Sequence, residues 1–100
     1  EDMNDDSYDF GDTGAQPGMT RFFINVGRNV DLTPKIIVEE VSQLVGIAQN
    51  KIGRIDIFDN FTFLEVSKEV APFVYEGLKY SRLNGARINL EPAKPRPKRK

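Results

Sequence analysis

The stretch IDIFDNFTFLEV, residues 55–66, predicts a β-hairpin whose two faces differ in chemistry. Two runs rich in β-branched and aromatic residues flank Asp59 and Asn60, a pair that suits a two-residue hairpin turn. With this turn Ile57 lies opposite Thr62, and directly opposed residues share a face. One face then collects aliphatic side chains, while the other collects three of the chain's seven phenylalanines: Phe58, Phe61 and Phe63.

The charged residues of the hairpin indicate which face contacts water. Arg54, Asp56 and Glu65 fall on the same face as the phenylalanines, and charged groups are rarely buried without partners. The register also places Arg54 opposite Glu65, which predicts a cross-strand ion pair of little energetic consequence at a surface. The hairpin therefore predicts an exposed aromatic face, which a monomer has little reason to present unless something binds there.

The flanking segments predict two helices and two more strands. Residues 21–27 read as a strand, and Thr33 before Pro34 is a typical helix start. Apolar residues then follow at helical spacing, with Gly46 as a candidate stop: Ile37, Val41, Leu44, Val45 and Ala48. A second helix, entered through Pro72, has its own apolar set: Ala71, Val74, Tyr75 and Leu78. Asn84 and Gly85 predict a turn into a last strand over residues 86–90.

The order strand, helix, strand, strand, helix, strand predicts an α+β fold, a ferredoxin-like βαββαβ sandwich with two helices on one face of a four-stranded antiparallel sheet. Side chains alternate along strands, so the outer strands contribute to both faces. Phe22, Ile24, Val26, Ile88 and Leu90 are expected to point inward. The open face is expected to carry Phe23, Asn25, Arg54, Phe58, Phe61, Phe63, Arg87 and Asn89.

The net charge of −1 conceals a strong segregation of charge along the 100 residues. Residues 1–20 hold six acidic and no basic residues, and residues 21–91 are balanced. The last nine residues hold five basic residues and no acidic ones: Lys94, Arg96, Lys98, Arg99 and Lys100. We therefore expect an acidic disordered linker over 1–20, one folded domain over 21–91 and a basic, proline-rich tail over 92–100.

The absence of cysteine and histidine limits the chemistry open to this chain. It excludes a disulfide framework, a thiolate nucleophile and the usual general base. The acidic stretch does not fit a calcium loop, because Phe10 stands where glycine is required. No run approaches the ~20 apolar residues of a membrane span. We predict a cytoplasmic domain with no enzyme activity, no cofactor, no metal and no membrane partner.

An exposed set of aromatic rings beside amide and guanidinium groups favours single-stranded nucleic acid. Unstacked bases stack on such rings, and their edges form hydrogen bonds with the polar groups. The basic tail adds an attraction to phosphate that does not depend on base sequence. We therefore expect RNA to bind the open face and the tail. The alternative is that the same face docks on another protein.

Two short motifs resemble those of an RNA-recognition motif. FFINVG, 22–27, resembles its first-strand motif, and DNFTFLEV, 59–66, resembles its third-strand motif. Phe23, Phe61 and Phe63 then occupy the stacking positions. The second motif departs from the family pattern, because it opens with Asp-Asn where a basic residue and glycine are expected.

Longer runs resemble the RNA-binding domain of bacterial DbpA- and DeaD-type DEAD-box RNA helicases: RFFINVGRNVDLTPKIIVEEV (21–41), IGRIDIFDNFTFLEV (52–66) and LNGARINL (83–90). The resemblance implies an accessory domain that tethers a helicase to its RNA, whether single-stranded, structured or ribosomal. The chain has neither a G-x-x-x-x-G-K-[ST] phosphate loop nor a D-E-A-D sequence, so ATP hydrolysis would belong to the rest of the parent protein. The alternative partner for the aromatic face is the helicase core or a ribosomal protein.

Overall fold

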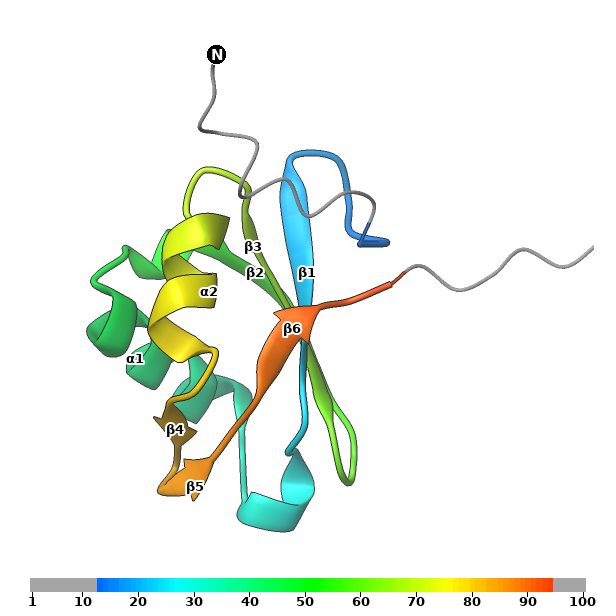
Figure 1. Cartoon of the computed structure of the whole chain (residues 1–100), viewed down its shortest axis with the longest axis vertical. Coiled ribbons are helices and arrows are strands. Elements are labelled where there is room, and N and C mark those ends of the chain that lie inside the picture. The colour runs from blue at the N-terminus through cyan, green and yellow to red at the C-terminus, as the bar shows by residue number, and fades with distance from the viewer. Residues whose placement is uncertain (1–12, 95–100) are drawn as a thin grey trace, which may run out of the picture.

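A computed structural model describes residues 13–94 and shows a four-stranded antiparallel sheet with two helices on one side (Figure 1). The sheet order is β2-β3-β1-β6, with strands β1 (Met19–Ile24), β2 (Ile52–Ile57), β3 (Thr62–Ser67) and β6 (Leu90–Pro92). The helices are α1 (Pro34–Val45) and α2 (Ala71–Leu78), and two short 3-10 turns are η2 (Arg28–Val30) and η3 (Gln49–Lys51). A separate hairpin joins β4 (Arg82–Leu83) to β5 (Ala86–Arg87). The predicted α+β architecture is confirmed.

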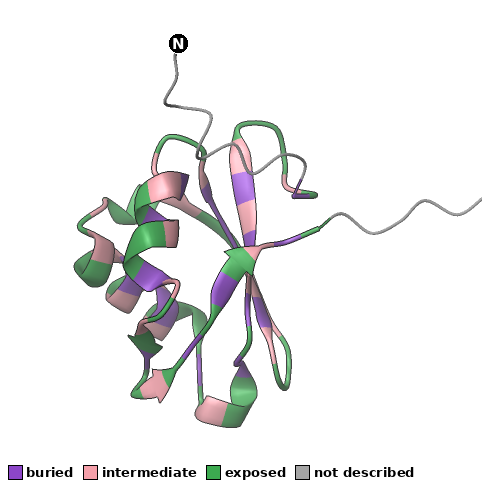
Figure 2. Cartoon of the chain, viewed as in Figure 1, coloured by how far each residue is buried: buried purple, intermediate pink, exposed green. Residues whose placement is uncertain are grey.

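The hydrophobic core lies between the sheet and the helices, and buried positions alternate with partly buried ones along β1 (Figure 2). Phe22 and Ile24 of β1 are fully buried, as are Leu64 and Val66 of β3. The register predicted for the β2–β3 hairpin is also confirmed, since Ile57 pairs with Thr62 and the two preceding pairs follow in step. Alternation alone therefore correctly assigned the faces of β1 and of the β2–β3 pairs next to the turn.

Helix α1 begins where its sequence predicts. The Thr33 hydroxyl oxygen accepts a hydrogen bond from the Ile36 amide at 3.2 Å, and Pro34 is the first helical residue. The predicted second helix is also present, with Ala71 and Leu78 at its ends.

The expected extent of the buried face of α1 was wrong. The helix ends at Gly46, which has a φ of 81° and donates its amide to the Ser42 carbonyl at 2.8 Å. Ala48 therefore lies beyond the helix, and Leu44 is 51% exposed. Val45, which also belongs to the expected apolar set, faces α2 near Gly77.

The last strand of the sheet starts later than expected. Asn84 and Gly85 form the predicted turn, with φ values of 51° and 81°. That turn closes the separate β4–β5 hairpin, however, and sheet pairing resumes only at Leu90, which lies opposite Ile24. Arg87 belongs to β5 and lies outside the four-stranded sheet, so its expected place on the open face was wrong.

Strand β1 begins at Met19, slightly before the expected start of the folded domain. The Thr13 hydroxyl is buried and accepts a hydrogen bond from the Arg21 amide at 2.9 Å, and the Lys68 amide donates to the Gly18 carbonyl at 3.0 Å. Residues 13–18 therefore contact the sheet. Residues 1–12 of the expected linker lie outside the described residues, as do four of the basic tail residues: Arg96, Lys98, Arg99 and Lys100.

The turn between β2 and β3 is held by contacts from η2. Its two central residues, Asp59 and Asn60, have no positive φ. The two-residue hairpin turn expected from their sequence would require positive values. The Phe58 amide donates to the Phe61 carbonyl at 2.8 Å, whereas the Phe58 carbonyl accepts from the Arg28 amide at 2.9 Å. The Asn29 amide donates to the Asp59 carbonyl at 2.8 Å. Backbone hydrogen bonds from η2 therefore hold this turn, in place of the expected two-residue turn with positive φ values.

Gly27 makes this close approach of η2 possible, and its replacement is expected to damage the fold. A Cβ at this position would lie 2.1 Å from the Phe58 carbonyl oxygen and 2.7 Å from that of Phe61. Both are backbone atoms, so the turn itself would have to move. We expect Gly27→Ala to lower the free energy of unfolding by about 3 kcal/mol, measured by urea denaturation.

Gly77→Ala is the matched control. Its added Cβ meets the Val45 Cγ2 atom at 3.2 Å, and that side chain can give way. We expect a change within about 1 kcal/mol, because alanine also favours the helix. Equal losses for the two variants would contradict the role given to Gly27.

Candidate nucleic-acid interface

The open face of the sheet carries a cluster of four phenylalanines, named here the Phe cluster: Phe23, Phe58, Phe61 and Phe63. Phe23 of β1 lies directly opposite Phe63 of β3. The rings of Phe58 and Phe61 stack with centroids 4.7 Å apart, and Phe63 meets both of them edge-on. Phe23 contacts Phe61 at 5.7 Å and Phe63 at 5.8 Å. The prediction that these rings gather on the face away from the helices is confirmed.

The Phe cluster is open to solvent to a degree that suits a binding surface. Phe58 is 42% exposed, and the other three rings are partly exposed. None of the four belongs to the buried core. Each ring is held by ring neighbours and still presents surface on which a flat group can stack.

Charged side chains beside the Phe cluster partly neutralise one another. The Asp56 carboxylate lies 3.1 Å from Arg54 Nε and 3.6 Å from Arg21 Nη2. The Arg21 guanidinium also lies over the Phe63 ring, 4.2 Å from its centroid. One carboxylate is thus shared by two arginines, which lowers the positive potential that this face presents.

Arg21 was missed by sequence reasoning, although strand alternation places it on the same face as Phe23. Its Nε is buried and has no hydrogen-bond partner within the part of the chain that the structure describes. Arg21 begins the predicted strand, and applying the same alternation to it would have placed it on the open face. Arg21 is therefore an additional candidate donor beside the rings.

The predicted ion pair between Arg54 and Glu65 is not formed. The pairing of β2 with β3 shifts register between Ile52 and Ile55, because β2 has an extra residue there. Arg54 lies in this irregular segment and reaches Asp56 instead. Glu65 is only 4% exposed, so its expected position in water was also wrong.

The two asparagines predicted for this face meet at the edge of the sheet. The Asn89 amide donates to the Asn25 Oδ1 atom at 2.8 Å, and the Asn25 amide donates to the Asn89 carbonyl at 3.3 Å. Both residues are exposed. They form a polar rim where β1 approaches β6.

Lys94 is the one basic residue of the predicted tail that the structure describes, and it is exposed. It follows β6 and lines a hollow of about 320 Å³ together with Phe23, Phe63 and Glu91. Lys94 therefore lies at the border of the Phe cluster. Glu91, which is acidic, lies at the same border and pairs with Phe23 in the sheet.

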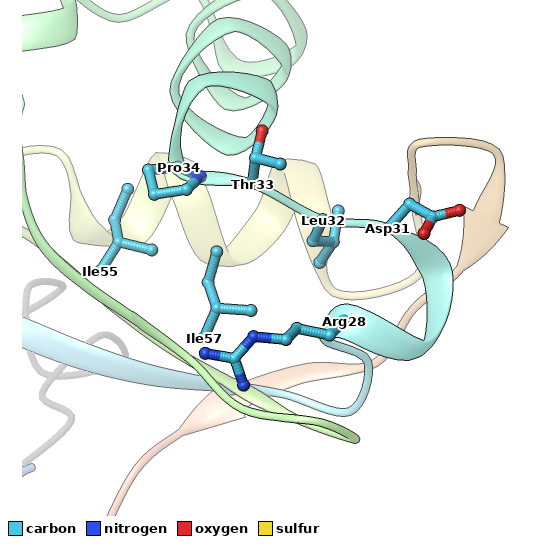
Figure 3. Close-up of a pocket in the computed structure, with 7 residues that line it drawn as sticks. All are labelled: Arg28, Asp31, Leu32, Thr33, Pro34, Ile55 and Ile57. Atoms are coloured by element: carbon cyan, nitrogen blue, oxygen red, sulfur yellow. The ribbon is translucent and has the colours of Figure 1, made fainter.

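A larger hollow of about 560 Å³ lies on the helix side of β2 (Figure 3). Ile55 and Ile57 point from β2 toward Pro34 and Leu32, and these four side chains form apolar walls. Its other lining residues are Arg28, Asp31 and Thr33. Because inward residues of β2 line it, this hollow lies on the side of the sheet opposite to the Phe cluster.

Other kinds of site find no support within residues 13–94. No group of three or more acidic side chains there is placed to hold a metal ion. Neither described helix is long and apolar enough to cross a membrane. The Phe cluster with its polar border is therefore the candidate site of this part of the chain.

The position of the Phe cluster outside the core predicts a modest contribution to stability. We expect Phe61→Ala to lower the free energy of unfolding by about 1–2 kcal/mol, through lost ring contacts. Phe22→Ala, which empties a fully buried position, should cost about 3–5 kcal/mol. Urea denaturation of both variants measures the difference. Losses of equal size would show that the cluster belongs to the core and is not a free surface.

Comparison with known proteins adds a family and two structural neighbours. A family model described as the DbpA RNA binding domain matches residues 21–92. A chain of the Chaetomium thermophilum Mex67:Mtr2 complex is 20% identical with a TM-score of 0.58, over 79% of this chain and 99% of that one. The cell division protein ylmH from Streptococcus pneumoniae is 18% identical with a TM-score of 0.59, over 83% of this chain and 51% of that one. No match was found among curated proteins.

At these identities the two structural neighbours show the fold alone. The family match is more informative, because it spans well over half of the chain and includes both helices and the entire Phe cluster. It implies a non-catalytic domain that binds RNA. The chain belongs to the DbpA RNA binding domain family.

Proposed function

We propose that this domain tethers a DEAD-box RNA helicase to its RNA through the Phe cluster and the basic tail, in the cytoplasm of a bacterium. The observation that carries the proposal is a partly exposed four-ring cluster on the open sheet face of a chain that belongs to an RNA-binding family. The helicase core would be part of the same parent chain, as the resemblance implies.

Stacking of unpaired bases on the Phe cluster is the main source of affinity in this proposal. Each stacked base contributes about 1–3 kcal/mol, so two engaged rings supply about 2–6 kcal/mol before ordering costs. The rings already contact one another, with Phe58 and Phe61 at 4.7 Å. Since the free protein holds them in place, little side-chain entropy remains to be lost on binding.

Hydrogen bonds to base edges would come from the border of the cluster. Asn25 and Asn89 form the rim on one side, and Arg54 lies on the other. Such groups can read the edges of splayed bases. Arg54 and Arg21 share Asp56, however, so the attraction of the sheet face for phosphate is reduced.

The basic tail supplies charge that the sheet face lacks. Lys94 borders the Phe cluster, and the proposal extends phosphate contact to Arg96, Lys98, Arg99 and Lys100. Contacts of this kind are independent of base sequence and weaken as salt rises. Together the two surfaces would hold RNA near the core, where a short flexible linker raises its effective concentration to about the millimolar range.

A protein partner for the same face is the second candidate function. The observation that favours it is the partial neutralisation of Arg21 and Arg54 by their shared partner Asp56, beside partly buried rings, which is chemistry that also suits a protein surface. The partner in that case would be the helicase core or a ribosomal protein.

Substitution of single rings separates the two functions. We expect Phe61→Ala and Phe63→Ala each to raise the dissociation constant for a short single-stranded RNA by about 5- to 100-fold, which corresponds to the loss of one stacked base. Fluorescence anisotropy with a labelled RNA of about ten nucleotides, long enough to cross the site of one small domain, measures this change.

Phe73→Ala is the matched control for both variants. Phe73 is 63% exposed but lies on α2, which covers the opposite side of the sheet, so its loss should leave RNA affinity unchanged. An unchanged affinity in Phe61→Ala and Phe63→Ala would contradict RNA stacking. The Phe cluster would then be assigned to a protein partner.

A further inference from the structure

The β4–β5 hairpin places two arginines directly opposite each other. Arg82 and Arg87 are paired across the strands, and both are exposed. The neighbouring pair points the other way, with Leu83 fully buried. Like charges in directly opposed positions destabilise a strand pair, so folding stability gives no reason for this arrangement.

The backbone pattern brings the two arginines close together. The Ile88 amide donates to the Ser81 carbonyl at 2.9 Å, so residues 81 and 88 form a hydrogen-bonded pair of the hairpin. The next pair toward the turn, Arg82 with Arg87, is therefore of the non-hydrogen-bonded kind. In such pairs the Cα atoms lie about 4.5 Å apart and the side chains are closer than in the other kind.

Neither arginine has a carboxylate partner within residues 13–94. The basic residues there that do form ion pairs are Arg21, Arg28, Lys51, Arg54 and Lys79. These five are half of the ten basic residues in that range. Arg82 and Arg87 are adjacent and have no carboxylate partner in this range, so both are available to bind an external anion.

The hairpin is anchored to the body of the domain. The Asn84 amide donates to the Glu40 Oε1 atom at 2.8 Å, and the Asn84 Nδ2 atom donates to the Val30 carbonyl at 2.8 Å. Together with the buried Leu83, these bonds fix the turn against α1 and η2. The positions from which the two arginines project are thus set before any ligand arrives, which reduces the entropy cost of binding.

The hairpin leads directly to the rim of the aromatic face (Figure 1). Arg87 ends β5 and Leu90 begins β6, a separation of at most ~10 Å of extended chain. Asn89 lies between them and contacts Asn25 at the edge of the sheet. A strand of RNA that leaves the Phe cluster across this rim would reach the arginines within a few nucleotides.

An exposed ring stands beside this route. Tyr80 is 81% exposed and precedes β4, and with Asn89 and Leu90 it lines a groove of about 310 Å³. The Lys79 amine lies 5.9 Å from the Tyr80 ring, and its bond to Glu76 raises the pKa of Lys79 above its ordinary value. Aromatic and cationic groups therefore continue from the sheet edge to the hairpin.

We propose that Arg82 and Arg87 form a site for backbone phosphates of RNA, adjoining the Phe cluster. This inference rests on the proposed RNA binding and assigns to the hairpin a stronger attraction for phosphate than the partly neutralised sheet face provides. Arginine suits the role because its planar fork donates two parallel hydrogen bonds to a phosphate group. Bases would stack on the sheet while their backbone continues over the hairpin.

The double variant R82Q/R87Q tests the site in the whole chain. The dissociation constant for a short single-stranded RNA is measured by fluorescence anisotropy over a series of salt concentrations. Each phosphate contact contributes about 0.7 to the slope of log affinity against log salt for single strands, so the slope should become shallower by about 1.4. The variant should remain as stable as the parent chain or more so, because a like-charge pair has been removed.

The control variant K35Q/K68Q removes two exposed lysines that have no ion-pair partner within residues 13–94. Its slope should change much less than that of R82Q/R87Q, although the net charge is the same. An unchanged slope in R82Q/R87Q, or equal changes in both variants, would overturn the site. Phe61→Ala in the same titration reports on sheet stacking separately, because its effect should appear at every salt concentration.

Discussion

The hydrogen bond from the Phe58 amide to the Phe61 carbonyl, at 2.8 Å, closes the β2–β3 hairpin and sets its register. In that register Ile57 and Thr62 lie in the core layer while the rings take the open face. A slip of one residue would exchange the two faces of the strand, exposing aliphatic side chains and burying charge. The turn is held by backbone bonds from η2, which approaches closely because Gly27 has no side chain. The aromatic face therefore depends on the fit between two loops that are distant in sequence.

Stacking and charge are separated in this domain. The sheet face provides rings, but its two arginines share Asp56. The β4–β5 hairpin provides Arg82 and Arg87, neither of which pairs with a carboxylate in the described part of the chain. Base stacking is little affected by salt, whereas phosphate attraction falls steeply with it. A domain that uses both would remain bound to single-stranded RNA at moderate salt, and its positive charge would raise the association rate.

The features predictable from sequence are those with local causes. Strand alternation was sufficient for the Phe cluster, and the start of α1 followed from its cap. The turn at Asn84 showed where the chain reverses, but not which strand it pairs with next, so Arg87 was placed on the wrong surface. Arg54 was paired with the wrong acid because the register was continued without a bulge, although Gly53 inside the strand is a local signal of one. The like-charge pair of the hairpin follows from the local turn at Asn84 and Gly85. The sharing of Asp56 depends on tertiary register, which only the structure reveals.

The most direct measurement is the change in backbone amide NMR shifts as a short single-stranded RNA is titrated into the chain at two salt concentrations. We predict shifts at Phe23, Phe61 and Phe63 that persist at the higher salt concentration, because stacked bases would alter the environment of the sheet itself. Shifts confined to Lys94 and the tail residues that follow it, and lost at higher salt, would contradict base stacking on the Phe cluster.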